Sequence, residues 1–85
     1  MKTNPNFVMN RFSDVNVLVD VTGQLNGVVK LSDTSADVWE ALSQGKTVED
    51  AAKVLCDKYE VTYEKALKDT REFCEKMLEQ GFLEK

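Results

Sequence analysis

Residues 63–80 form the longest helical pattern in this chain, and they constrain the fold more than any other segment does. At about 100° per residue, one arc of the helical wheel is mostly apolar and the opposite arc is charged. The first arc contains Ala66, Leu67, Thr70, Phe73, Cys74, Met77 and Leu78. Thr62 precedes the stretch as a candidate N-cap, and Gly81 follows it where a left-handed residue ends many helices. Such a helix needs a sheet or other helices to cover its apolar face.

Two shorter helices are expected before it. Ser32 is a candidate N-cap for the first helix, which should stop at Gly45. This helix should bury Trp39 as the central side chain of the core. Thr47 and Asp50 have the spacing of a capping box at the start of the second helix. The second helix would bury a stripe made of Val48, Ala51, Ala52, Leu55, Cys56 and Tyr59.

The first third of the chain favours strands. Residues 15–22 have the clearest pattern, because four valines recur at period two and so share one face. Residues 7–12 favour a shorter strand. Residues 23–27 are turn formers, and residues 28–31 should return antiparallel as a hairpin. Residues 1–6 are polar, contain the only proline, and are expected to form a flexible arm.

The order of elements predicts one α+β domain that spans residues 1–85. It would be a winged helix-turn-helix-like fold, with an N-terminal three-stranded antiparallel sheet followed by three helices. With 42% hydrophobic and 31% charged residues, the chain has the composition of an ordinary globular domain. It has no apolar run long enough for a membrane span and no signal-peptide core, so a cytoplasmic location is expected.

The composition argues against several kinds of chemistry. The chain has no histidine, which removes the commonest general base and the commonest metal ligand. We therefore expect no enzymatic activity, no cofactor and no metal. Cys56 and Cys74 lie apart on the apolar faces of their helices, so buried free thiols are expected in preference to a disulfide or a redox pair.

Several short motifs, in this order, resemble the PqqD-like family. They are Leu31-Ser32-Asp33-Thr34-Ser35-Ala36, Val38-Trp39, Gly45-Lys46-Thr47-Val48, Tyr59, Asp69 and Gly81-Phe82-Leu83. The resemblance covers residues 15–83. It departs from the usual family pattern at Ser32, Asp33, Thr70 and Cys74, where the family more often has Asn, Glu and bulkier aliphatic residues.

The resemblance implies a peptide chaperone, of the kind that acts in coenzyme PQQ synthesis and serves as the recognition element for ribosomally made, post-translationally modified peptides. Its partners would be the leader segment of a precursor peptide and a modifying enzyme, often a radical SAM protein. An extended peptide would add to an exposed strand edge. The edge would consist of Val28, Val29, Lys30 and Leu31. The opposite wall would come from the long helix, through Asp69, Phe73 and Lys76.

The sequence leaves two alternative functions to consider. Winged helix-turn-helix domains often bind DNA, but the long helix carries five acidic and four basic side chains, and the whole chain has a net charge of -4. Nucleic-acid binding is therefore not expected. A plain structural or oligomerisation domain is the other alternative, because an uncovered strand edge can also pair with a second copy to form a homodimer.

Overall fold

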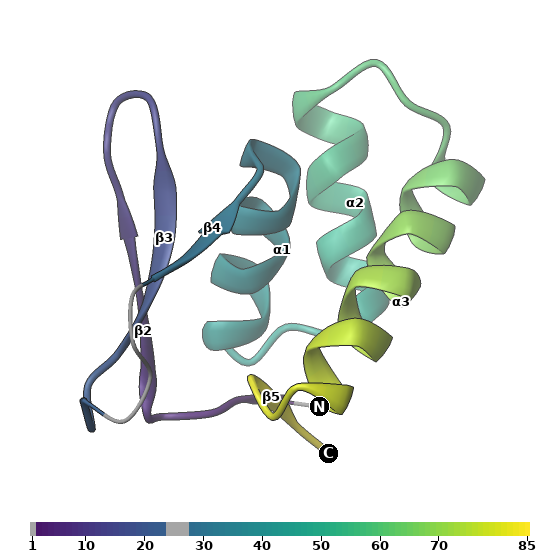
Figure 1. Cartoon of the computed structure of the whole chain (residues 1–85). Helices are drawn as coiled ribbons and strands as arrows, with labels where there is room; N and C mark the ends of the chain where they lie inside the picture. The colour runs from purple at the N-terminus through teal and green to yellow at the C-terminus, as the bar shows by residue number, and fades with distance from the viewer. Residues whose placement is uncertain (1, 24–27) are drawn as a thin grey trace.

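The computed structural model describes residues 2–23 and 28–85, in which antiparallel strands are followed by three helices (Figure 1). The predicted α+β fold is confirmed. The elements are β1 (Lys2–Thr3), β2 (Phe7–Arg11), β3 (Asn16–Asp20), β4 (Val29–Leu31), α1 (Asp33–Ser43), α2 (Val48–Lys58), α3 (Tyr63–Glu79) and β5 (Leu83–Glu84). Most of the turn expected at residues 23–27 lies outside the described residues.

The main sheet is antiparallel and has the strand order β2-β3-β4. In the central strand, Leu18 is fully buried and joins the core, whereas its neighbours Val17 and Val19 point to the other face. The face that the valines share is therefore the outer face of the sheet, and Val21 at its end is 60% exposed. The period-two pattern located the strand correctly, but the single leucine decides which face meets the helices.

The N-terminal segment differs from the flexible arm expected from its composition. β1 pairs antiparallel with β5, which is the last strand of the chain. Asn4 extends this contact, since its backbone N–H donates to the carbonyl of Phe82 at 3.0 Å and its side-chain amide donates to that of Gly81 at 2.9 Å. The arm is ordered by a partner some 80 positions away in the chain, so local composition carries no signal for it.

The helix ends follow the predicted capping chemistry. Ser32, Thr47 and Thr62 each accept a hydrogen bond from a backbone N–H in the first turn of the helix that follows. Thr47 and Asp50 form the complete reciprocal capping box. After α3, Gly81 has a φ of 82°, a left-handed conformation that costs glycine little, and it turns the chain back. Phe82 and Leu83 are then buried, as the apolar tail predicted.

Helix α1 lies between the sheet and the other two helices (Figure 1). Trp39 is only 3% exposed and belongs to the core, as predicted. Both cysteines are free thiols, and burial raises the pKa of the Cys74 thiol to about 11. Among the described residues, no helix has the length and apolar character that crossing a bilayer requires.

We predict that Trp39→Ala lowers the free energy of unfolding by about 3 to 5 kcal/mol, because it leaves a cavity where the largest core side chain was. Urea denaturation followed by circular dichroism measures the change. Phe12→Ala is the matched control, since Phe12 is 60% exposed and its truncation should change the stability by only about 0.5 kcal/mol or less. Equal midpoints for the two variants would place Trp39 outside the core.

Candidate functional site

Strand β4 is an edge of the described sheet, because β3 is the only described strand that pairs with it. The ladder fixes which of its backbone groups face outward. Val21 donates to Asn6 and Phe12 donates to Val15, so the odd-numbered residues of β3 direct their backbone groups toward β2. The even-numbered residues therefore direct theirs toward β4.

The register of β4 then identifies its outward residue. Val29 lies opposite Leu18 and Leu31 lies opposite Asn16, so both bond to β3. Lys30, between them, directs its N–H and C=O away from β3 to the open edge, and Val28 has the same direction by alternation. The edge predicted from the sequence exists, and Lys30 is the residue that presents it.

The buried side chain of Asn16 fixes the end of this edge strand. Its amide nitrogen donates to the carbonyl of Leu31 at 3.3 Å and to a carboxylate oxygen of Asp33 at 2.9 Å, while its oxygen accepts from Nε of Arg11 at 3.2 Å. A single side chain thus joins β2, the last residue of β4 and the first residue of α1. The link sets the direction in which the chain leaves the strand and enters the helix.

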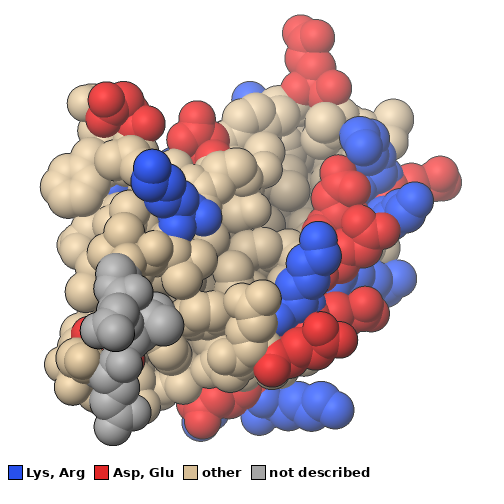
Figure 2. Space-filling model, viewed as in Figure 1, with Lys and Arg blue, Asp and Glu red and all other residues tan. Residues whose placement is uncertain are grey.

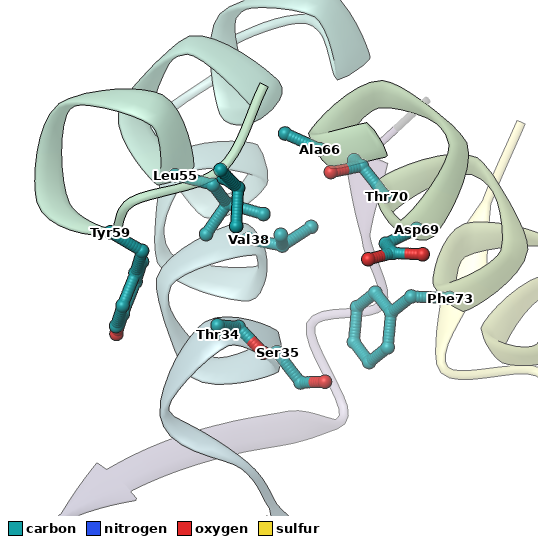
Figure 3. Close-up of a pocket in the computed structure, with 10 residues that line it drawn as sticks. Thr34, Ser35, Val38, Leu55, Tyr59, Ala66, Asp69, Thr70 and Phe73 are labelled. Atoms are coloured by element: carbon teal, nitrogen blue, oxygen red, sulfur yellow. The ribbon is translucent and has the colours of Figure 1, made fainter. Parts of the chain in front are cut away.

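A cavity of about 110 Å³ opens between α3 and the first turns of α1 (Figure 3). These turns of α1 follow β4 directly in the chain. Its floor consists of side chains that are almost fully buried, namely Val38, Leu55, Ala66 and Thr70. More exposed side chains surround its mouth, namely Thr34, Ser35, Tyr59, Val61, Asp69 and Phe73. The lining is mainly apolar, and its polar groups are several hydroxyl groups and the carboxylate of Asp69.

Charge around the site is uneven. Figure 2 shows side chains of both signs interspersed over α3, whereas the surface between α3 and the sheet is mostly uncharged. At the mouth of the cavity, the carboxylate of Asp69 lies 3.4 Å from the ammonium group of Lys65, one helical turn earlier. Both side chains are more than half exposed, so this pair is a weak surface contact.

The ring of Tyr59 is held at the mouth of the cavity by a buried carboxylate. Its hydroxyl donates to Asp37 at 2.8 Å, and Asp37 is only 3% exposed. Arg11 and Lys58 donate to the same carboxylate at 2.8 and 3.1 Å. Strand β2, helix α1 and the C-terminal end of α2 therefore meet at one side chain.

The titration of Asp37 reflects two opposed effects. Burial alone would raise the pKa of its carboxyl group, but the hydrogen bonds from Arg11, Tyr59 and Lys58 outweigh burial and hold that pKa below its usual value. The same contact raises the pKa of the Tyr59 hydroxyl, because ionisation would place two negative charges together. The carboxylate is therefore charged at neutral pH and keeps Tyr59 in place as a hydrogen-bond donor.

The structure brings some of the sequence-predicted site residues together. Asp69 and Phe73 line the cavity, and Lys76 lies on the same flank of α3 one turn later, outside the lining. Most of the cavity was not predicted from the sequence, because the cavity also depends on α1, α2 and the link before α3. The missed residues are Thr34, Ser35, Val38, Leu55, Tyr59, Val61, Ala66 and Thr70. Tyr59 was recognised in the sequence as part of a family motif. Its place in the cavity depends on a hydrogen bond to Asp37, which the spacing of residues in the sequence does not predict.

The arrangement defines a class of protein, namely an α+β domain that has an open sheet edge at β4 and a small, mainly apolar cavity between α1 and α3. Within the described residues, no group of acidic or cysteine side chains could hold a metal ion. Residues 16–83 match the family model of coenzyme PQQ synthesis protein D, PqqD. The chain belongs to the PqqD family.

Two solved structures are similar to the whole chain. One is TbiB1 in complex with the TbiA(beta) leader peptide, with a TM-score of 0.83 and 25% sequence identity over 99% of this chain and 95% of that one. The other is lasso peptide synthetase B1 complexed with the leader peptide, with a TM-score of 0.82 and 25% identity over 99% and 96%. A search of curated proteins finds no match.

We predict that Asp37→Asn lowers the free energy of unfolding by about 1.5 to 3 kcal/mol at pH 7, because the hydrogen bonds to Asp37 lose their charged acceptor. The pKa of Asp37 is lower in the folded state, so its contribution is complete above the unfolded value of about 3.9 and is lost as the pH falls through the folded value. The gap between parent and variant should therefore narrow below about pH 4.

Urea denaturation at a series of pH values measures this gap. Asp57→Asn is the control, since it removes an exposed carboxylate from α2 and should change the stability little at any pH. A gap for Asp37→Asn that is as large at pH 3 as at pH 7 would show that the charge of Asp37 does not stabilise the fold.

Proposed function

We propose that this protein is a peptide-binding module that captures the leader segment of a precursor peptide by strand addition at β4. The observation that carries the proposal is the outward direction of the Lys30 backbone at the open edge of β4. Membership of the PqqD family and the leader peptides in both similar structures support it. The function is binding and presentation, and the chemistry belongs to a separate modifying enzyme.

Strand addition divides affinity from selectivity. The N–H and C=O of Lys30 form a pair of hydrogen bonds with the peptide backbone, which any sequence can make. The peptide side chains alternate in direction, so only every second one turns toward the helices. The cavity behind the mouth formed by Asp69 and Phe73 then selects among the side chains that reach it.

The proposed binding residues differ in what they contribute. Val28, Val29, Lys30 and Leu31 form the docking edge, with Lys30 as its main backbone donor. Phe73 gives apolar contact area at the mouth of the cavity, and Asp69 offers an acceptor beside it. Lys76 is exposed one turn farther along α3, where it contacts only the part of the peptide that extends past the cavity.

The presentation step requires a second partner. We propose a modifying enzyme, such as a radical SAM protein, that acts on the core segment of the peptide while this protein holds the leader. The same open edge can pair with a second copy of this chain, so a homodimer formed through β4 would compete with peptide. Titration of the labelled protein with leader segments of the precursor peptides encoded beside its gene tests the proposal directly.

We predict that Lys30→Pro weakens leader-peptide binding by about 1 to 3 kcal/mol, because proline removes the outward N–H at the edge. An edge strand tolerates proline at such a position, so the fold should survive. Val29→Pro should instead disrupt the pairing of β4 with β3, because Val29 lies opposite Leu18 in the ladder. Calorimetry measures affinity, after circular dichroism has verified the fold of each variant.

Lys30→Ala is the matched control, since it removes the side chain but keeps the N–H, and it should bind nearly as tightly as the parent. If folded Lys30→Pro bound leader peptide as tightly as Lys30→Ala did, strand addition at this edge would be wrong. The wall of α3 would then have to hold the peptide by side-chain contacts alone.

We also predict that Phe73→Ala weakens leader-peptide binding by about tenfold or more, because it removes an aromatic contact at the mouth of the cavity. Lys76→Ala should change affinity by only about threefold or less, and less still at high salt, because the lysine is exposed. Fluorescence anisotropy at low and high salt measures both. The reverse order of effects would place the peptide along the exposed flank of α3, away from the cavity.

A further inference from the structure

The floor of the cavity contains a polar group with no partner. Thr70 is 1% exposed, and its buried hydroxyl oxygen has no hydrogen-bond partner among the described residues. Figure 3 shows this oxygen directed toward the side of the cavity where Val38 and Leu55 lie. Buried hydroxyl groups without a partner are uncommon, because desolvation without a compensating hydrogen bond is costly. The side chains of the other floor residues are apolar and cannot supply one.

We propose that the cavity receives an uncharged, hydroxyl-bearing side chain of the bound peptide, a serine, threonine or tyrosine, whose hydroxyl group hydrogen-bonds to Thr70. The inference rests on the proposed function, because the ligand is the captured peptide. It assigns to Thr70 the role of specificity determinant. One rotation about its Cα–Cβ bond changes the direction of the hydroxyl without moving the helix.

The residues that line the cavity restrict which peptide side chains it can bind. A charged group would be buried against Val38, Leu55 and Ala66 with no opposite charge on the floor, so lysine, arginine and carboxylates are excluded from its depth. An amide carries two donor hydrogens and an acceptor, and Thr70 alone cannot satisfy them. A hydroxyl group can be satisfied by one partner, and each of the two hydroxyls can act as donor or acceptor.

The size of the cavity agrees with this class. A volume of about 110 Å³ is ample for a short hydroxyl side chain. It is smaller than the roughly 150 Å³ of an engineered cavity that admits benzene. A tyrosine ring would therefore have to remain partly in the mouth, between Tyr59 and Phe73, while its hydroxyl reached inward. An aliphatic side chain also fits, but it leaves the hydroxyl of Thr70 without a partner, and that difference is the source of selectivity.

The alternative within the chain is a local hydrogen bond. In a helix, a threonine hydroxyl can turn to the carbonyl of the residue four positions earlier, which in α3 is Ala66. If that rotamer prevailed in solution, Thr70 would be satisfied without a ligand and would not discriminate between peptides. The experiment must therefore separate selectivity from stability.

A display library of random linear peptides is selected against the parent, Thr70→Val and Thr70→Ser. Valine matches the shape of threonine without the hydroxyl, and serine keeps the hydroxyl. We expect the parent and Thr70→Ser to enrich Ser, Thr or Tyr at one position, and Thr70→Val to enrich aliphatic residues or phenylalanine there. Synthetic pairs that differ only by Thr and Val, or by Tyr and Phe, should differ by roughly threefold to tenfold in affinity for the parent and not for Thr70→Val.

Thermal unfolding of the same three proteins completes the test. Removal of an unpartnered hydroxyl should leave Thr70→Val at least as stable as the parent. A less stable Thr70→Val that selects the same peptides as the parent would assign the hydroxyl to Ala66 and overturn the inference, while peptide binding itself would stand. Failure of all three proteins to enrich any peptide would overturn the proposed function and this inference with it.

Discussion

Helix α1 must be buried on nearly every side, and the rest of the structure depends on how this is achieved. Six of its eleven residues are buried, because the sheet packs on one side and α2 and α3 pack on the other. Five of the six are apolar, and their burial supplies much of the hydrophobic stabilisation available to so small a chain. The sixth is Asp37, whose charge is compatible with burial only because three donors surround it.

The same constraint positions the two sides of the proposed binding groove. The first turn of α1 comes directly after β4, and α1 contacts both β4 and α3. The open strand edge and the helical wall are thus positioned against one rigid helix. Asn16 fixes the exit from β4, and Asp37 fixes Tyr59 at the mouth of the cavity. The residues that would touch a peptide are therefore held by buried polar contacts behind them.

Much of the fold could be predicted because its signals are local. The caps at Thr47 and Thr62 and the left-handed Gly81 depend on residues within one turn, and all three were found. The face of β3 was harder to predict, since apolar residues occupy both of its faces and only packing into the core distinguishes Leu18 from the valines. The pairing of β1 with β5 could not be predicted, because neither strand has a signal without the other.

The candidate site could likewise be predicted only where its signals are local. The edge strand followed from the hairpin and the family motifs, but the outward direction of Lys30 follows only from the register with β3. The cavity gathers side chains from α1, α2 and α3 that no periodic pattern connects. Thr70 illustrates the limit. On a helical wheel it is one more residue of the buried arc, and only the structure shows that its hydroxyl has no described partner.

The central claim is that a peptide completes the sheet at β4, and residue-resolved hydrogen exchange by nuclear magnetic resonance tests it most directly. In the free protein, the amides of Val29 and Leu31 bond to β3 and should exchange slowly, while the outward amide of Lys30 should exchange fast. Saturation with a leader peptide should slow the exchange of Lys30 by a large factor, with little change at Val29. If Lys30 exchanged as fast in the saturated complex as in the free protein, the peptide would bind elsewhere and strand addition at β4 would be contradicted.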